Sequence, residues 1–241
     1  QTMNIPILTM EGYEADDILG TVAKRCQAEG IEVSVVSGDR DLLQLADTHI
    51  KIRIPKTSKG STQIYDYYPE DVKEQYQVTP TEFIDVKALM GDTSDNIPGV
   101  PSIGEKTATN LIVSYGSIEN AYAHVDEIKP PRAQKALSEY YDMAQMSKEL
   151  ATICITCPIP FSYEEALIGN LYTPEAFKFM KRMEFKSILN RFDSASMEDK
   201  ENGPQKSFKE VTDKKEAEKI FKAAEKAAVT GLQLITGSRA K

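Results

Sequence analysis

Seven carboxylates in three short clusters are spaced to hold divalent metal ions rather than to solvate a surface. The clusters lie in the runs Glu11–Ile18, Ser37–Leu43 and Gly91–Gly99, and each stands where an apolar segment ends or begins. Hard oxygen ligands of this kind suit Mg²⁺ or Mn²⁺, which keep several waters for substrate phosphates. The pattern therefore predicts phosphate chemistry. The candidate catalytic and metal-binding residues are Glu14, Asp16, Asp17, Asp39, Asp41, Asp92 and Asp95.

The composition is ordinary for a soluble globular protein. The chain has 241 residues, 41% hydrophobic and 27% charged, enough for one large domain or two smaller ones. No apolar run approaches the roughly 18 residues that a membrane span needs, and no signal peptide opens the chain, so we expect a cytoplasmic location. The net charge of −8 argues against a general nucleic-acid coat, although bound metal would neutralise the clustered acids.

Three cysteines include one C-x-x-C pair, Cys154 and Cys157. A zinc or redox site is one interpretation, but the chain has no second cysteine pair. The segment Thr152–Cys157 is predicted to be a strand, in which residues three apart point to opposite faces. The two thiols would then diverge, so we expect reduced, structural cysteines.

The first part of the chain alternates short apolar runs with helical patterns. This alternation predicts βαβ units around a parallel sheet, and in such sheets ligands bind beyond the carboxyl ends of the strands. The first two acidic clusters each follow a predicted strand and should lie on that edge. Strands are predicted over Ile5–Leu8, Ile31–Val36, Ile50–Ile54 and Thr62–Tyr65, helices over Glu14–Glu29 and Asp39–Leu45, and a polar loop over Pro55–Ser61.

From Pro69 onward the hydrophobic pattern becomes helical. A polar stretch over residues 193–207 is predicted to be a linker, and the tail after it predicts a helix over Lys214–Ala228 and a strand over Thr230–Ile235. The other helices are predicted over Pro69–Tyr76, Pro80–Met90, Glu105–Tyr115, Ser117–His124 and Pro131–Met146, with at least one more within Pro174–Phe192.

The run Ile97–Ile112 is the second strong signal. Gly99 and Gly104 permit a tight connection between helices, and Gly104 directly precedes an amphipathic helix whose free N–H groups can bind an anion. Together these features predict a helix-hairpin-helix that grips one nucleic-acid strand by its phosphates. A plain helix–turn–helix is the alternative, but the acidic cluster two residues upstream favours the functional interpretation. The candidate DNA-binding residues are Gly99, Val100, Ser102, Ile103, Gly104, Lys106 and Thr107.

These motifs resemble the 5′-nuclease (flap endonuclease-like, 5′-3′ exonuclease) domain family of bacterial DNA polymerase I. The resemblance covers roughly Asn4 to Phe192, and the tail from Ser207 is similar to the beginning of a proofreading-type exonuclease domain. The runs that carry it are long and rich in unusual residues: GYEADDILG (12–20), SGDRDLLQL (37–45), FIDVKALMGDTSDNIPGVPSIGEKTATNL (83–111) and EFKSILNRF (184–192).

The resemblance implies an α/β fold: a parallel-sheet, PIN-like nuclease core with an α-helical lobe that contains the helix-hairpin-helix. Residues 1–67 would form the C-terminal part of the core and 68–192 the helical lobe, with the hairpin at about 97–112. Residues 193–207 would be a linker, and 208–241 the start of a truncated proofreading-exonuclease-like domain. The family domain begins before Gln1, so we expect an N-terminally truncated fragment.

The resemblance also implies metal-dependent phosphodiester hydrolysis at 5′ ends, flaps and nicks of DNA. In the family the acidic clusters bind two or more Mg²⁺ or Mn²⁺ ions, and a K⁺ ion often sits in the hairpin. Glu14, Asp16 and Asp17 would form the core of the metal site. The parent protein would be a bacterial, nucleoid-associated enzyme of DNA replication and repair with polymerase and nuclease activities. The remaining acids, Asp39, Asp41, Asp92 and Asp95, would complete a second site.

Three departures from the family pattern limit this expectation. Two aspartates and a basic arch that precede the matching region are not in this sequence, so we expect the isolated chain to have little or no nuclease activity. Ser102 stands where the family hairpin commonly has glycine. The tail segment Thr230–Gly237 lacks the Asp-x-Glu pair of an active proofreading exonuclease.

Two other functions remain open. A non-catalytic helix-hairpin-helix DNA-binding module would use the hairpin and keep the carboxylates for structure, and its binding would survive EDTA and weaken with salt. A metal-dependent phosphatase on a similar sheet would leave the hairpin unexplained. The sequence leaves the oligomeric state and the balance of exonuclease and endonuclease cleavage undetermined.

Overall fold

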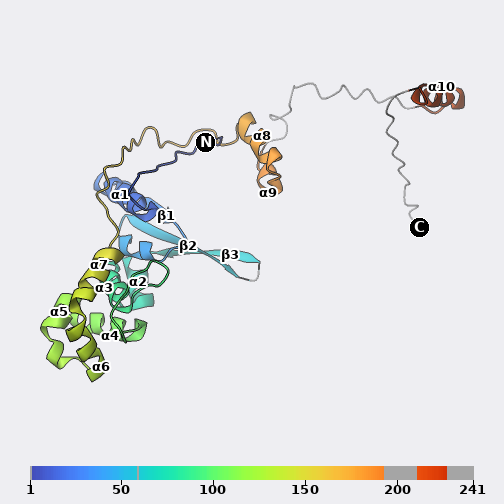
Figure 1. Ribbon diagram of the computed structural model, residues 1–241. Helices are drawn as coiled ribbons and strands as arrows, with labels where there is room; N and C mark the ends of the chain where they lie inside the picture. The colour runs from blue at the N-terminus through green and yellow to red at the C-terminus, as the bar shows by residue number, and fades with distance from the viewer. Residues whose placement is uncertain (1, 59, 193–210, 227–241) are drawn as a thin grey trace. The chain divides into compact units, whose positions relative to one another are not determined.

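The computed structural model describes residues 2–58, 60–192 and 211–226, and the chain divides into two compact units, Gln1–Leu171 and Tyr172–Lys241 (Figure 1). The predicted linker 193–207 and the predicted strand Thr230–Ile235 lie outside the described residues. In the described part of the chain, no helix is long and apolar enough to cross a membrane.

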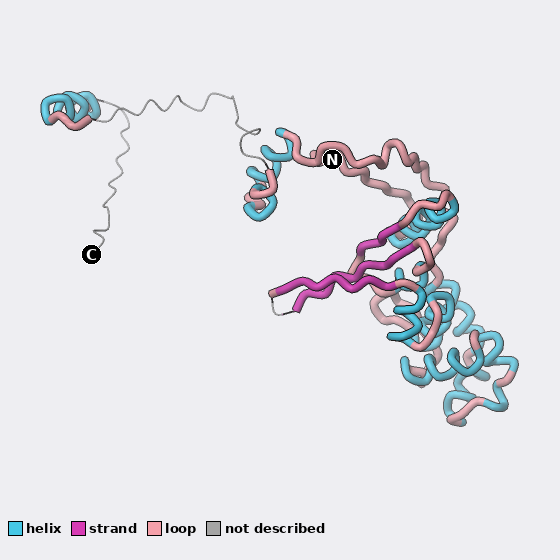
Figure 2. The backbone as a smooth tube through the Cα atoms, turned by 180° about the vertical axis from the view of Figure 1, so that it is seen from behind, coloured by secondary structure: helices cyan, strands magenta, loops and turns pink. Residues whose placement is uncertain are grey.

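A three-stranded sheet forms the first layer of unit 1 (Figure 2). The strands are β1 (Val33–Val36), β2 (Ile50–Ser58) and β3 (Ser61–Tyr67), in the spatial order β1-β2-β3. β1 and β2 are parallel, as predicted, with Val33 opposite Ile50, whereas β2 and β3 form an antiparallel hairpin. The sheet is therefore mixed, with an α/β connection only between its first two strands.

The predicted polar loop Pro55–Ser61 is wrong, because both strands continue through most of it and pair in register to Ser58 and Ser61. Cross-strand contacts compensate for the polar sequence. Arg53 Nε donates to Asp66 Oδ1 over 2.8 Å, and the Lys56 ammonium lies 4.6 Å from the centre of the Tyr65 ring. Cross-strand pairs of this kind stabilise a hairpin that local composition alone does not predict.

The predicted strand Ile5–Leu8 is also wrong. These residues form no strand, and the Ile5 and Ile7 side chains are exposed, 51% and 65%. A short apolar run becomes a strand only when a neighbouring strand pairs with its backbone, and none of the described strands lies beside it. Leu8 instead packs against a small apolar cluster of Ile18, Cys157 and Ile159.

Helix α1 (Ala15–Ala28) forms where it was predicted, with Ile18, Ala23 and Cys26 buried and Leu19 exposed. Gly30, in the left-handed region at φ 72°, ends the helix and turns the chain toward β1. After β1 the chain enters η1 (Asp41–Leu45), a 3₁₀ helix rather than an α-helix, whose leucines are buried. The βα order thus brings the second acidic cluster to the carboxyl end of β1.

The helical layer of unit 1 follows the predicted boundaries closely up to α5. One prediction fails: Pro131–Met146 is two helices, because Tyr140 leaves the helical region and Tyr141 stacks on Tyr122 with ring centres 3.8 Å apart. The elements are α2 (Pro69–Tyr76), α3 (Pro80–Met90), α4 (Glu105–Tyr115), α5 (Ile118–Ala123), η2 (Val125–Glu127), α6 (Pro131–Glu139) and α7 (Tyr141–Ala151).

Helix α3 is the centre of the helical layer and packs against η1, α4 and α7. One hydrophobic core runs from the sheet into these helices, and it includes Ile52 of β2, Leu89 of α3 and Ile112 of α4, each fully buried. The buried carboxylate of Asp85 accepts hydrogen bonds from the Ile118 backbone and from Lys148. These bonds hold the middle of α3 to α5 and α7.

The predicted strand Thr152–Cys157 is an irregular loop that crosses the surface of α1. Its cysteine sulfurs do not diverge but lie 4.0 Å apart. Strand geometry would require a pairing partner. The loop instead finds hydrogen-bond partners among the side chains of α1, including Asp17 and Thr21.

Unit 2 contains α8 (Pro174–Arg182), α9 (Lys186–Leu189) and α10 (Lys214–Ala224). Thr173 caps α8 by accepting a hydrogen bond from the Ala176 amide, and Phe192 packs edge-on against the rings of Tyr172 and Phe177. The predicted helix over Lys214–Ala228 is confirmed up to Ala224.

Candidate metal centre

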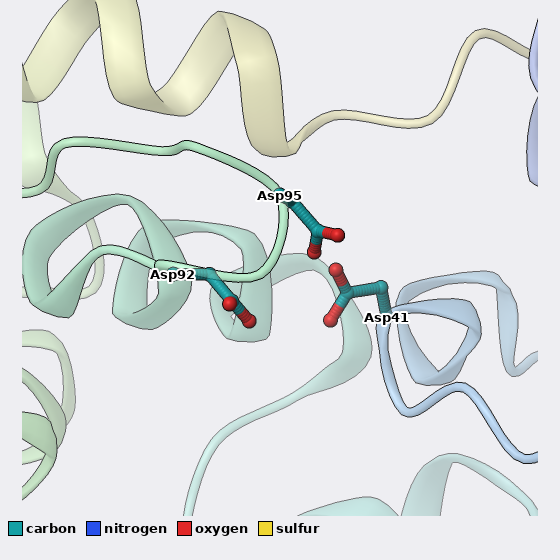
Figure 3. A group of neighbouring side chains, drawn as sticks. All are labelled: Asp41, Asp92 and Asp95. Carbon is teal, nitrogen blue, oxygen red and sulfur yellow. The ribbon is translucent and has the colours of Figure 1, made fainter.

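Three acidic side chains from two distant segments converge at one point (Figure 3). One carboxylate oxygen from each of Asp41, Asp92 and Asp95 lies within 4.8 Å of the other two, close enough for a single cation to contact all three. Asp41 begins η1, just beyond the carboxyl end of β1, while the other two lie in the loop after α3. The fold therefore merges members of the second and third sequence clusters into one group.

Backbone geometry fixes the loop that carries Asp92 and Asp95. The Asp92 and Ile97 backbones exchange two hydrogen bonds, of 3.0 and 2.8 Å, which close the loop at its base. Gly99, at φ 65°, passes so close to Gly91 that an added Cβ would lie 2.5 Å from the Gly91 nitrogen. Only glycine fits there, and the close approach keeps the acidic loop against the end of α3.

Lys87 is buried beneath this group and neutralises part of its charge. Its ammonium lies 2.7 Å from Asp41 Oδ1 and 2.5 Å from Asp92 Oδ2, and the residue is 8% exposed. A buried ammonium between two carboxylates compensates the repulsion that would otherwise separate them. Lys87 therefore holds η1 and the loop after α3 together.

The charges around Lys87 alter the pKa of each partner. Burial alone would lower the pKa of Lys87, but its hydrogen bonds to Asp41 and Asp92 outweigh burial and raise it. Burial raises the pKa of Asp41, against the opposing hydrogen bond from Lys87 and with help from the nearby negative charges of Asp39 and Asp95. Hydrogen bonds from Lys87 and from Ser94 hold the pKa of Asp92 well below its usual range. A divalent cation would favour the ionised form of both carboxyls.

The first acidic cluster lies at the N-terminus of α1 and is held by backbone donors. Asp17 Oδ2 accepts the Glu14 amide over 3.1 Å and Oδ1 accepts the Cys154 amide over 2.8 Å. Asp16 Oδ1 accepts the Asp17 amide, and its pKa is raised, first by burial and then by the charges of Asp17 and Asp39. Asp17 thus caps its own helix and anchors the loop after α7.

Asp39 connects the two acidic groups. Its Oδ1 accepts the Asp41 amide over 2.9 Å, which fixes the turn into η1. One cleft contains the first cluster, Asp39, Asp41 and Asp95, and a neighbouring cleft contains Asp39, Asp41, Asp92 and Asp95. The two clefts share Asp39, Asp41 and Asp95, and together they form an acidic mouth lined by all seven predicted acids. Among the described residues, only Asp41, Asp92 and Asp95 lie close enough together to contact a single ion. The acids lining the first cleft are Glu14, Asp16, Asp17, Asp39, Asp41 and Asp95.

The predicted hairpin adjoins this mouth. Gly104 precedes α4, and its carbonyl accepts the amides of Thr107 and Ala108. Lys106, on the first turn of α4, lines the same cleft as Asp92 and Asp95. The exposed N-terminal turn of α4 thus presents a cation and the positive end of a helix next to the acids.

Among the predicted hairpin residues, some are buried and anchor the turn, whereas others are exposed. Val100 and Ile103 are each 3% exposed, and their amides donate to Leu89 and Val100 carbonyls, so they anchor the turn. Gly99 donates its amide to the buried Ser147 hydroxyl over 3.1 Å. Ser102, at φ 72°, adopts the left-handed conformation that favours glycine, and its exposed hydroxyl accepts a hydrogen bond from Arg132.

Lys87 was not predicted as a site residue, although the sequence contains one signal for it: a charged residue within an apolar helix. Lys87 stands between Val86 and Ala88 in the largely buried helix Pro80–Met90, where a charged residue needs a buried partner. Lys87 has two such partners: Asp41, which is 46 residues earlier in the chain, and Asp92, which is five residues later. Asp85, in the same helix, pairs with Lys148 and serves packing.

Comparison with known proteins identifies the origin of this arrangement. Residues 1–77 match the 5′-3′ exonuclease N-terminal resolvase-like domain, and residues 78–173 match the 5′-3′ exonuclease C-terminal SAM fold. The chain belongs to the 5′-3′ exonuclease family. The two matched regions meet between α2 and α3, and the mouth of acids takes residues from both.

Curated relatives of this family member are DNA polymerases I. The chain is 45% identical over 195 residues to DNA polymerase I of Bacillus caldotenax, which covers 81% of this chain and 22% of the relative. It is 43% identical over 206 residues to DNA polymerase I of Bacillus subtilis (strain 168), covering 85% of this chain and 23% of the relative. The chain thus spans less than a quarter of the length of these relatives.

Solved structures share the fold. A structure of bacteriophage T5 5′-exonuclease with bound divalent metal ions (zinc) is 25% identical with a TM-score of 0.53, over 62% of this chain and 53% of that one. A T5 flap endonuclease structure with DNA and metal ions is 25% identical with a TM-score of 0.50, over 61% and 52%. The α/β core with a helical, SAM-like part is therefore the fold of this family, as the sequence predicted.

Proposed function

We propose that the chain is the metal-dependent 5′-nuclease part of a DNA-processing enzyme, which hydrolyses phosphodiester bonds at 5′ ends, flaps and nicks. The observation that carries the proposal is the convergence of Asp41, Asp92 and Asp95 beside the exposed start of α4. Acidic ligands suit a hard cation, and a helix N-terminus with a lysine suits a phosphate. Together they fit a phosphodiester substrate better than either feature alone.

The residues present fit divalent ions of the Mg²⁺ or Mn²⁺ class. Asp41, Asp92 and Asp95 would hold one ion, and the α1 cluster with Asp39 would supply oxygens for another. The all-carboxylate donor set, without histidine or thiolate, supports these hard cations over zinc. When bound, such ions supply an activated water and stabilise charge on the departing oxygen.

The chain's own residues would orient the substrate. The α4 N-terminus and Lys106 would bind a backbone phosphate of the duplex and set its distance from the acids. Lys87, which already bridges two of the acids, would keep their oxygens turned into the mouth. A K⁺ ion in the hairpin belongs to the same proposal, supported by the tight turn with positive φ at Gly99 and Ser102.

We also propose the domain division expected from the sequence, with a core over 1–67, a helical lobe over 68–192 and the start of a proofreading-like domain over 208–241. The end of β3 at Tyr67 and the start of α2 at Pro69 support the first boundary. Replication and repair of DNA, the work of the DNA polymerases I that the chain resembles, would be the wider process. DNA is the proposed partner.

A flap-cleavage assay tests the proposal. The 241-residue chain is incubated with a 5′-labelled flap duplex and Mn²⁺, alongside Asp95→Asn and the matched variant Asp126→Asn, whose carboxylate is exposed in η2. Because two aspartates and the basic arch of the family are not in this sequence, we expect the chain alone to cleave little or not at all. Any residual metal-dependent cleavage should fall by about 100-fold or more in Asp95→Asn and stay unchanged in Asp126→Asn. Measurable cleavage at equal rates by the two variants would contradict the assigned site.

Metal binding gives a second readout that does not need turnover. We expect Mn²⁺, measured by the loss of its free-ion electron paramagnetic resonance signal, to bind the chain and to bind Asp95→Asn about tenfold or more weakly. Duplex binding that persists in EDTA, with no cleavage and no Mn²⁺ uptake, would instead favour the non-catalytic hairpin module.

A further inference from the structure

Two cysteines in the loop after α7 lie ready to bond to each other. The sulfur atoms of Cys154 and Cys157 are 4.0 Å apart, and both thiols are free. A disulfide has an S–S length of about 2.05 Å, so the sulfurs would have to approach by roughly 2 Å. Rotation of a cysteine side chain about its Cα–Cβ bond moves the sulfur by a distance of this order.

Helix α1 fixes the backbone of both cysteines. The Cys154 amide donates to Asp17 Oδ1 over 2.8 Å, and its carbonyl accepts the Thr21 hydroxyl over 3.3 Å. The Cys157 amide donates to the same hydroxyl over 3.0 Å, and its carbonyl accepts Arg25 Nη2 over 2.8 Å. All four backbone polar groups of the pair are therefore bound to side chains of one helix.

Thr21 is the centre of this clamp, the set of hydrogen bonds between the side chains of Asp17, Thr21 and Arg25 and the backbone of the two cysteines. The residue is fully buried, and its single hydroxyl bridges the carbonyl of one cysteine and the amide of the other. A buried group that uses both its donor and its acceptor on the two ends of a four-residue segment holds those ends at a fixed separation. The thiols consequently face each other in the reduced protein.

The two thiols differ in access to solvent. Cys154 is half-buried and can meet a small oxidant, whereas Cys157 is fully buried against Ile18 and Ile159. One partly accessible thiol beside one protected thiol is the arrangement of a redox-sensitive pair, in which the first reacts with the oxidant and the second resolves the product. The third cysteine, Cys26, is buried in α1.

We propose that Cys154 and Cys157 form a reversible oxidation site whose co-reactant is hydrogen peroxide. The Cys154 sulfur attacks one peroxide oxygen, which breaks the O–O bond and yields a sulfenic acid and water. The Cys157 sulfur then displaces the sulfenic hydroxyl, forming the S–S bond and a second water. The peroxide accepts the two electrons that the two thiols lose, and a dithiol reductant reverses the reaction.

Thiol counting on the 241-residue chain tests the proposal. The native protein is treated with hydrogen peroxide, unreacted thiols are alkylated after unfolding, and peptides are weighed by mass spectrometry. We expect the labelled cysteines to fall from three to one, Cys26, with the peptide that holds both partners lighter by two hydrogen atoms. Dithiothreitol should restore all three labels.

Three outcomes would overturn the proposal: oxidation of Cys154 to a sulfinic acid with Cys157 still alkylated, a disulfide that includes Cys26, or a bond between two chains. The variant Cys157→Ser provides an independent check, because it removes the resolving thiol. We expect Cys154 then to stop as a sulfenic acid that dimedone captures. Failure of dimedone to label it, in folded protein, would contradict the proposed order of reaction.

A substitution at Thr21 tests the contribution of the clamp while both cysteines are kept. Thr21→Val keeps the shape but removes both hydrogen bonds, and we expect disulfide formation to slow by about tenfold. Thr48→Val, at an exposed threonine outside the loop, should leave the rate unchanged. Equal rates for the two variants would show that the clamp does not align the thiols. If Thr21→Val does not fold, the mass measurement on the unaltered chain still decides the proposal.

Discussion

The two acidic groups of the mouth are held in different ways. At α1, backbone amides occupy Asp16 and both oxygens of Asp17. At the second group, Asp92 Oδ1 accepts the Ser94 amide, but Asp41 and Asp92 are joined to each other by one buried ammonium, that of Lys87. Backbone donors are fixed by the helix and the loop, whereas an ammonium on a four-carbon side chain can move. The first group is therefore rigid, and the second is bound by a contact that an incoming cation can replace or reorganise.

The first group is held by hydrogen-bond geometry, and the second is held by charge compensation. The α1 group stays in place because hydrogen bonds to amides orient each carboxylate without neutralising it. The Asp41–Asp92 group stays in place because a counter-charge cancels repulsion at short range. Removing a hydrogen-bond or charge partner should therefore lower the free energy of unfolding most at the second group. Added metal should restore stability at that group alone.

The largest expected effect is that of Lys87→Met. The substitution keeps the buried volume but leaves two carboxylates facing each other without a cation, which we expect to lower the free energy of unfolding by about 3 kcal/mol. Urea unfolding at neutral pH in EDTA measures the change. Lys135→Met, at an exposed lysine of α6, is the matched control and should change it by less than about 0.5 kcal/mol.

Divalent metal should partly rescue Lys87→Met. Because a bound cation replaces the missing counter-charge, we expect Mn²⁺ to raise the urea midpoint of this variant more than that of the unaltered chain. An equal rise in both proteins would show that the ammonium and the metal do not act on the same carboxylates.

A smaller effect is expected for Asp17→Ala. The variant loses the acceptor for the Glu14 and Cys154 amides, at a cost of about 1–2 kcal/mol in urea unfolding. Asp142→Ala, in the exposed first turn of α7, removes a helix-start acid at which the structure shows no such loop anchor. Added Mn²⁺ should not restore the stability of Asp17→Ala, and restoration would contradict a role based on shape.

The smallest effect concerns pH. The pKa of Asp92 is held low by hydrogen bonds from Lys87 and Ser94, so its stabilising contribution is present above the usual aspartate pKa and is lost as the pH falls. Burial raises the pKa of Asp16, so its ionisation costs stability, and that cost disappears as the pH falls through the raised value. Carboxyl carbon titration by nuclear magnetic resonance in metal-free buffer should show Asp92 protonating at a lower pH than Asp16. The reverse order would contradict the distinction between the two groups.

Local sequence signals predicted the helices of unit 1 well. Pro80 and Pro69 each occupy the first turn of a helix, and Gly116 ends α4 in the left-handed region, so boundaries set by such residues agree with the structure. The elements whose bounds were predicted wrongly have no helix-starting proline or helix-ending glycine at the positions where the prediction failed. Tyr140 breaks a helix without proline or glycine, and the hairpin β2–β3 extends through residues that only cross-strand pairing makes stable.

The sequence by itself determined the chemistry of this protein: which carboxylates are available, which glycines permit close turns, and the family to which they belong. Only the tertiary structure decided which acids meet, that Lys87 lies between two of them, and that Cys154 and Cys157 face each other. The physical reason is the sequence separation over which each interaction acts. Residue type and short spacing set local conformation and ligand preference, whereas charge compensation and sulfur alignment depend on contacts between segments far apart in the chain.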